Sequence, residues 1–157
     1  MIDRYLEVAS FIERLHRQFL EVVKLELEVL GIYDINNGQA MLLFNIGDDE
    51  MTIGELTLRG RYLKTNVSYN VKKMVESGYI AYKRSVHDRR LIYVQLTVKG
   101  WILHRQLITI FQRHTDKLRD TAIKQTDLEE VAVTMRRLEE FWLRADIYTP
   151  RPGVSAA

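Results

Sequence analysis

The amino-acid sequence predicts a mainly α-helical fold with one small β-hairpin, an α+β architecture. Three observations support this prediction. Apolar residues recur at helical spacing near both ends of the chain, capping residues and glycines divide the middle into short helices, and apolar and polar residues alternate strictly in a single segment. With 157 residues, 46% of them hydrophobic and 28% charged, the chain is long enough to bury a core of its own.

The first expected element is a long helix over residues 4–30. Its apolar side chains form one stripe of about seven helical turns, and Gly31 suits its C-terminal cap. The stripe consists of Val8, Phe11, Ile12, Leu15, Phe19, Val22, Val23, Leu27 and Leu30. A stripe of this length needs an apolar partner of similar length to cover it.

Two short helices are expected next. Asn36 or Asn37 can cap a helix that ends at Gly47. Thr52 and Glu55 form a capping box for a second helix that begins directly after Thr52. The middle of the chain is therefore expected to be a cluster of short elements.

Gly60 allows a tight turn into a further helix over residues 64–77, with Gly78 as its cap. Two short helices joined by a glycine turn are typical of a helix-turn-helix. The residues expected to point inward from the second helix are Val67, Val71 and Met74.

The opposite face of the 64–77 helix displays hydrogen-bonding and cationic groups, and no acid precedes Glu76. The residues of this face and its margins are Thr65, Asn66, Ser68, Tyr69, Asn70, Lys72 and Lys73. Such a face suits the major groove of DNA, which is about 12 Å wide. The alternative is a polar face that only meets solvent.

A β-hairpin is expected from residues 79–85 and 91–96, around a charged turn. In the turn, Asp88 is placed to hold the guanidinium of Arg90 through a charge-assisted hydrogen bond, which would make it a good probe of phosphates or of the minor groove. The alternative is an ordinary hairpin with a solvated turn. In the second strand, one face is expected to carry Ile92, Val94 and Leu96, and the other Tyr93 and Gln95.

Two further long helices are expected over residues 98–122 and 127–145. Thr97 supplies a cap for the first, and Asp127 with Glu130 a capping box for the second. Their apolar stripes consist of Leu103, Leu107, Ile110, Phe111 and Leu118, and of Leu128, Val131, Met135, Leu138 and Trp142. The helices at both ends are expected to pack together, either between two chains or as a three-helix core within one.

The net charge of +2 is distributed unevenly. From Arg59 to Arg105 there are eleven lysines and arginines against two acids, a net charge of +9, while the remainder holds twelve against nineteen, a net charge of −7. A cationic segment suits a polyanion, because each neutralised phosphate releases condensed counterions. The alternative is a solvated basic face.

Residues 88–100 follow the order D-x-R-x-x-x-V-x-L-T-x-x-G, and over approximately residues 5–145 the chain resembles the MarR (multiple-antibiotic-resistance regulator) family of bacterial transcription factors. The resemblance implies a winged helix-turn-helix lobe with the hairpin as its wing, and a dimerisation lobe of long N- and C-terminal helices. It also implies a homodimer that binds a pseudo-palindromic operator in double-stranded DNA, commonly as a repressor, and a small-molecule effector. Tyr69 stands where the family often has arginine, and Val86 where it often has proline.

The residues expected to contact DNA come from the recognition helix and the wing. Those of the recognition helix are Lys64, Thr65, Asn66, Ser68, Tyr69, Asn70, Lys72 and Lys73, and those of the wing are Arg84, His87, Asp88, Arg89 and Arg90. The resemblance further implies an effector pocket bordered by Phe11, Leu15, Phe19, Leu42 and Tyr62. The alternative for these five residues is a plain core.

The expected organisation is an N-terminal dimerisation helix in residues 1–34, a DNA-binding lobe in residues 35–100, C-terminal dimerisation helices in residues 101–147 and a tail in residues 148–157. No apolar run is long enough to span a bilayer and no signal peptide is evident, so a cytoplasmic location is expected.

Catalysis, cofactors and metals find little support in the sequence. There is no glycine-rich phosphate loop, H-E-x-x-H motif, nucleophile elbow or cysteine. The four histidines, His16, His87, His104 and His114, lack metal-ligand spacing. We therefore expect a protein that is not an enzyme, and the alternative function is a winged-helix dimer that serves as a protein-interaction or ligand-binding module without specific DNA readout.

Overall fold

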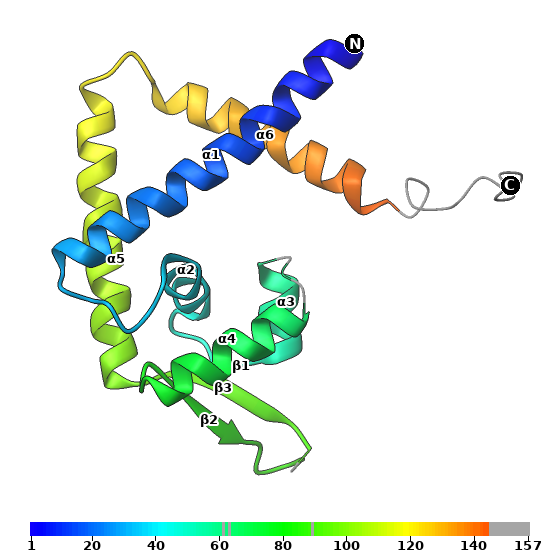
Figure 1. Cartoon of the computed structure of the whole chain (residues 1–157). Helices are drawn as coiled ribbons and strands as arrows, with labels where there is room; N and C mark the ends of the chain where they lie inside the picture. Colours follow the sequence, from blue (N-terminus) through cyan, green and yellow to red (C-terminus); the bar gives the residue numbers. More distant parts are fainter. Residues whose placement is uncertain (61, 63, 89, 145–157) are drawn as a thin grey trace, which may run out of the picture. The chain divides into compact units, whose positions relative to one another are not determined.

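The computed structural model describes residues 1–60, 62, 64–88 and 90–144, and it consists of two compact units that divide between Phe111 and Gln112 (Figure 1). In chain order the elements are α1 (Ile2–Val29), α2 (Asn37–Ile46), β1 (Met51–Thr52), α3 (Ile53–Arg59), α4 (Lys64–Glu76), β2 (Ile80–Arg84), β3 (Ile92–Leu96), α5 (Val98–Arg119) and α6 (Gln125–Leu143). The first unit holds every element up to the larger part of α5. The prediction of a mainly α fold with one small hairpin is confirmed.

Glycines end the three helices at which they were expected, with Gly47 following α2 at a φ of +56°. Gly31 has a φ of +70° after α1, and the Ile32 N–H donates to the Leu27 carbonyl at 2.9 Å. Gly78 has a φ of +78° after α4, where the backbone continues into β2. A left-handed residue at this point satisfies the last carbonyls of a helix, and glycine adopts it without steric cost.

Both short helices begin with capping boxes, of which the one at Thr52 and Glu55 was predicted, whereas at α2 only a cap by Asn36 or Asn37 was expected. The Asn36 side chain accepts the Gln39 N–H at 2.8 Å, and the Gln39 side chain accepts the Asn36 N–H at 3.0 Å. Thr52 and Glu55 are paired in the same way at the start of α3, with N–H contacts of 3.1 and 2.7 Å. These reciprocal bonds satisfy donors that a helix start leaves unpaired.

The hairpin is confirmed, but the sheet contains a third strand that was not predicted. The strand order is β1-β3-β2, all antiparallel, and Met51 of β1 pairs with Val94. A strand of two residues is too short to show alternating apolar and polar residues, so β1 could not be predicted from its own sequence. Ile92 shares a face of β3 with Val94 and Leu96, as predicted, but it is 42% exposed because it pairs with Arg84 next to the turn of the hairpin.

The core of the first unit lies between the short helices, the sheet, the first part of α5 and the C-terminal half of α1. Its most deeply buried side chains are Val23, Leu43, Ile46, Leu56, Val67, Val71, Met74, Ile80, Val94, Leu103 and Leu107. The predicted inward residues of α4 are therefore confirmed. Phe19 of α1 and Phe44 of α2 both contact the ring of Phe111, with centroid distances of 5.9 and 5.3 Å.

Helix α6 differs from its prediction at the start. It begins at Gln125, and the carboxylate of Asp127 accepts the Lys124 N–H at 2.8 Å, so Asp127 lies in the first turn and the expected box with Glu130 is wrong. No described residue of α6 is buried. Ala145 and the predicted tail lie outside the described residues. Among the described helices, none is both long and apolar enough to cross a membrane.

Candidate nucleic-acid interface

Helix α4 divides cleanly into a buried and an exposed face. Burial of Val67, Val71 and Met74 orients the helix, because residues three and four apart share one side. The exposed residues are Thr65, Asn66, Ser68, Tyr69, Lys72 and Lys73, and Tyr69 is 62% exposed. This face presents neutral hydrogen-bonding groups and two ammonium groups. The side chain of Lys64 lies outside the described residues.

Lys73 is held at the C-terminal end of this face. Its ammonium lies 3.1 Å from the Glu76 carboxylate and 6.0 Å from the centre of the Tyr69 ring. The hydrogen bond to Glu76 raises the pKa of Lys73, so the side chain stays cationic. Both partners are about half exposed, and such a pair exchanges readily for another anion.

Asn70 does not belong to the exposed face as predicted. Its side chain is half-buried, and its carbonyl oxygen accepts a hydrogen bond from the Gln39 amide at 3.2 Å. Its amide donates to the Asn66 backbone carbonyl at 2.9 Å. Asn70 therefore connects α4 to α2 through its side chain.

The turn of the wing is held by side chains bonding to backbone. Ser85 Oγ accepts the N–H groups of His87 and Asp88, both at 3.2 Å. Asp88 Oδ1 accepts the Arg90 backbone N–H at 2.9 Å. Asp88 was predicted to bond the guanidinium of Arg90. Among the described residues it bonds the main-chain N–H of Arg90 instead. Such turns fix the tip without using the charge of the arginine.

The outer surface of the wing carries arginines, a histidine and an apolar residue. Arg84, His87 and Arg90 are exposed, and Val86 at the tip is 91% exposed. Arg89 lies outside the described residues. Figure 1 shows the hairpin of β2 and β3 projecting from the helices of the first unit. The projecting tip separates these side chains from the core.

Part of the cationic segment is neutralised from within the chain. Arg59 contacts the Asp49 carboxylate at 2.8 Å, and Lys83 forms an ion pair with Glu50. The acidic loop before β1 therefore compensates two of the eleven cations counted in sequence. Counting charges by segment missed this, because Asp49 and Glu50 precede the cationic segment in the sequence.

A cavity of about 410 Å³ lies behind α4, between α1, α2 and the turn at Tyr62. Its lining consists of His16, Phe19, Leu20, Gly38, Met41, Leu42, Gly60, Tyr62, Asn66, Val67 and Asn70. Three of the five predicted pocket residues, Phe19, Leu42 and Tyr62, line this cavity. Phe11 and Leu15 do not, because they lie nearer the start of α1, where their side chains are exposed.

The polar groups of the cavity wall are held by neighbouring elements. The Asn45 amide donates to the Tyr62 hydroxyl at 2.6 Å, and the Asn37 amide donates to the Leu20 carbonyl of α1 at 2.8 Å. Burial raises the pKa of Tyr62, which keeps the hydroxyl neutral. The cavity is therefore mainly apolar, with neutral hydrogen-bonding groups contributed by Tyr62, Asn66 and Asn70.

The histidines are spread through the structure. His16 lines the cavity, and His104 is buried beside the rings of Phe44 and Trp101, at centroid distances of 5.1 and 5.4 Å. Within the described ranges, no group of three or more histidine or acidic side chains is arranged to hold a metal ion. The described residues therefore form an exposed polar and cationic surface on α4 and a mainly apolar cavity behind it.

Comparison with known proteins gives agreement in sequence and in fold. A model of the MarR family matches residues 33–91. The exopolysaccharide II synthesis transcriptional activator ExpG of Rhizobium meliloti (strain 1021) is 35% identical over 144 residues, which cover 92% of this chain and 74% of that protein.

Solved structures resemble the whole described fold. Streptococcus pneumoniae FabT, in complex with DNA, has a TM-score of 0.71 at 19% identity and covers 88% of this chain and 96% of its own. Staphylococcus aureus MarR, in complex with salicylate and kanamycin, has a TM-score of 0.70 at 24% identity, with coverages of 90% and 93%. The S. aureus MepR–DNA complex has a TM-score of 0.72 at 16% identity, with coverages of 86% and 97%.

Proposed function

Because this chain belongs to the MarR family of transcriptional regulators, we propose that it acts as a homodimer on a pseudo-palindromic DNA operator. In this proposal the two α4 helices of the dimer enter successive major grooves, with half-site centres about 10 base pairs apart. The wings lie over the flanking minor grooves.

The exposed face of α4 is the observation that carries the proposal. Thr65, Asn66, Ser68 and Tyr69 offer donors and acceptors for base edges or phosphates, and Lys72 and Lys73 add charge. An asparagine amide can pair with both hydrogen-bonding positions of adenine, so Asn66 is the strongest candidate for direct readout. Lys64, at the start of α4, is proposed to add a phosphate contact.

The wing is proposed to supply backbone and minor-groove contacts. Arg84 and Arg90 are exposed on either side of the turn, and Asp88 fixes its main chain. Guanidinium groups are favoured in the narrow minor groove, where the negative potential is strongest. We assign the same role to Arg89, and a supporting one to His87.

Dimerisation is proposed to involve residues 1–34 and 101–147. In α1, Phe11 and Leu15 are 45% and 53% exposed, and in α6, Val131 is 52% exposed. Each unit by itself thus leaves an apolar stripe in water. Exposed patches of this kind are typical of protein interfaces. A second copy of the chain is the proposed partner, because exposed apolar stripes on the long helices of both units would cover one another in a dimer.

We further propose that the cavity behind α4 binds a small-molecule effector. It has the size and the mainly apolar lining of ligand sites, with a few placed polar groups. The S. aureus MarR structure contains salicylate, which favours aromatic acids as the first probes. An effector acts only by binding one arrangement of the dimer better than another.

The proposed place of action is the cytoplasm, where the protein reaches DNA. The proposed function involves no catalysis. Repression by blocking a promoter was the expectation from sequence, whereas the relative ExpG is named an activator. We propose that the position of the operator decides between activation and repression. A dimer bound upstream of a promoter leaves the promoter accessible, whereas a dimer bound over the promoter blocks it.

Selection from a random DNA pool tests the proposal directly. The purified protein is expected to enrich an inverted repeat with half-site centres about 10 base pairs apart. Enrichment of no common sequence would refute specific readout and favour the alternative, a winged-helix dimer that serves as an interaction or ligand-binding module.

A further inference from the structure

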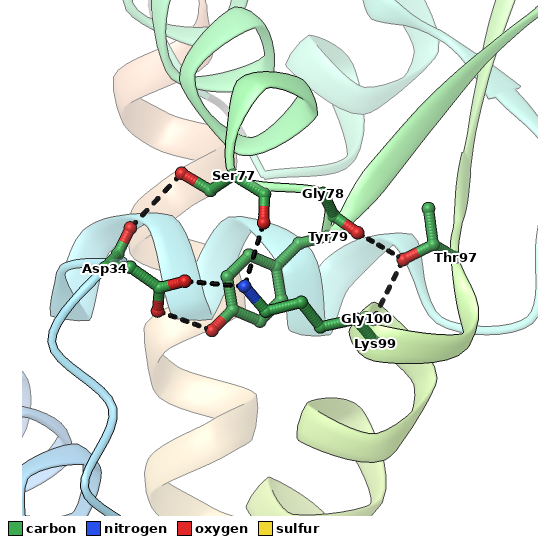
Figure 2. Close-up of polar contacts among 7 residues, drawn as sticks. All are labelled: Asp34, Ser77, Gly78, Tyr79, Thr97, Lys99 and Gly100. Carbon is green, nitrogen blue, oxygen red and sulfur yellow. Dashed lines mark hydrogen bonds and ion pairs between the residues drawn. The ribbon is translucent and has the colours of Figure 1, made fainter.

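Three separate segments meet at the C-terminal end of α4. Asp34, in the loop between α1 and α2, accepts a hydrogen bond from the Tyr79 hydroxyl at 2.7 Å and contacts the Lys99 ammonium at 2.6 Å (Figure 2). The same ammonium donates to the backbone carbonyl of Ser77 at 2.9 Å and lies 4.0 Å from the centre of the Tyr79 ring. We call Asp34, Tyr79 and Lys99, with the Ser77 carbonyl, the clasp.

The backbone around the clasp leaves little freedom. The Thr97 hydroxyl donates to the Gly78 carbonyl at 2.6 Å and accepts the Gly100 N–H at 3.1 Å, which joins the end of α4 to the start of α5. A Cβ atom at Gly100 would lie 2.2 Å from the Tyr79 carbonyl oxygen, so the two segments are in close backbone contact.

The charges of the clasp suit their positions. Lys99 places a cation at the C-terminal end of α4, where unpaired carbonyls concentrate negative potential. The hydrogen bond from Lys99 lowers the pKa of Asp34, while burial and the bond to Asp34 raise the pKa of Tyr79. Asp34 is therefore a carboxylate and Tyr79 a neutral hydroxyl over the whole neutral range of pH.

We propose that Asp34, Tyr79 and Lys99 are positioning residues that set the tilt of α4 and thereby the base readout of the dimer. This inference rests on the proposed DNA-binding function. Helix α4 has 13 residues and is about 20 Å long, so a tilt of about 10° at its C-terminal end moves the far end by about 3 Å. Hydrogen bonds to base edges do not survive such a shift, whereas phosphate contacts adapt.

The ion pair of the clasp adds little to the overall stability. The side chains of Asp34 and Lys99 are each 49% exposed, and ion pairs at this exposure contribute little to unfolding. A loss of the clasp should therefore appear in DNA discrimination before it appears in the fold. If the clasp only stabilised the fold, its loss would lower stability before it lowered DNA discrimination.

The test compares Lys99→Met, Asp34→Asn and Tyr79→Phe on a selected operator and on shuffled DNA. Lys99→Met is expected to lose about tenfold in affinity for the operator, about threefold for each of two recognition helices, and under about twofold on shuffled DNA. Lys99→Arg should recover much of the loss, because it keeps the charge and several donors. The matched control is Lys24→Met, which removes an equally exposed pair with Glu21 on α1.

Two further measurements test whether the clasp residues act together and whether they hold the end of α4. The double variant Asp34→Asn with Lys99→Met should lose no more operator affinity than the worse single variant, because the groups act as a unit. Amide hydrogen exchange at residues 73–79 should accelerate in Lys99→Met and not in Lys24→Met.

Unchanged exchange at residues 73–79, or equal losses on operator and shuffled DNA, would overturn the clasp as a positioning device. A wild-type protein that fails to distinguish the two DNAs would instead overturn the proposed function. Accelerated exchange in that case would still show that the clasp holds the end of α4.

Discussion

Arg90 illustrates how much of a residue's role depends on its main chain. The sequence placed a carboxylate two residues before it, and the structure shows that carboxylate bonded to the Arg90 N–H at 2.9 Å. The turn is fixed in this way, and the side chain remains exposed. A fixed backbone with an exposed guanidinium combines low entropic cost with reach toward DNA.

Replacement of Arg90 by alanine is therefore expected to weaken operator binding while leaving the turn intact. The slope of log affinity against log salt should fall by about 2 for the dimer, one for each wing, because each lost phosphate contact releases one counterion fewer. Binding titrations across a salt series measure this. Arg136→Ala on α6 serves as the control for loss of an exposed arginine, and an unchanged slope for Arg90→Ala would remove the wing from the contacts.

Asn70 marks the limit of sequence reasoning at this scale. Helical periodicity placed it on the outer face of α4, but the face of a helix is broad and its margins are decided by neighbours. The partner is Gln39, 31 positions away, and its amide is available because it also forms the capping box of α2. Only the packing of α2 against α4 reveals this contact.

At the scale of elements, local chemistry predicted the helices well. Capping residues and glycines gave the starts of α2 and α3 and the ends of α1 and α4, because those signals act within a few residues. Strand β1 and the start of α6 were missed. The first exists only through pairing with β3, and at the second a lysine occupies the cap while Asp127 bonds back to it.

The capping box of α3 gives a direct test of this scale. Thr52→Ala removes the oxygen that accepts the Glu55 N–H, and should lower the free energy of unfolding by about 1 kcal/mol. Urea denaturation measures the change. Thr52→Ser keeps the oxygen and should remain near the wild type, and an equal loss in both variants would mean that the methyl group rather than the cap is responsible.

For the whole molecule, the sequence identified apolar stripes but not what covers them. A stripe looks the same whether its partner is another part of the chain or a second copy. In the structure, α6 has no buried described residue, and the start of α1 exposes Phe11 and Leu15. These exposures favour a partner outside the chain, as the dimer proposal requires.

A charge placed in the α6 stripe should separate the dimer. Val131→Glu is expected to halve the mass measured by light scattering, and to weaken operator binding by about a hundredfold or more, since the second half-site no longer binds as part of one molecule. Arg136 lies on a different side of the same helix, so Arg136→Gln, which makes the same change in net charge as Val131→Glu, is the control. A Val131→Glu protein with the mass of the wild type would place the interface elsewhere.

We propose that the exposed face of α4 reads DNA sequence. The core, the contact with α2 and the clasp hold this face in position. Fluorescence anisotropy of the wild-type protein on the operator and on shuffled DNA of equal length, across a salt series, tests the claim of sequence readout most directly. We predict a preference of about a thousandfold for the operator at physiological salt. Equal affinity for both DNAs at every salt concentration would contradict the claim.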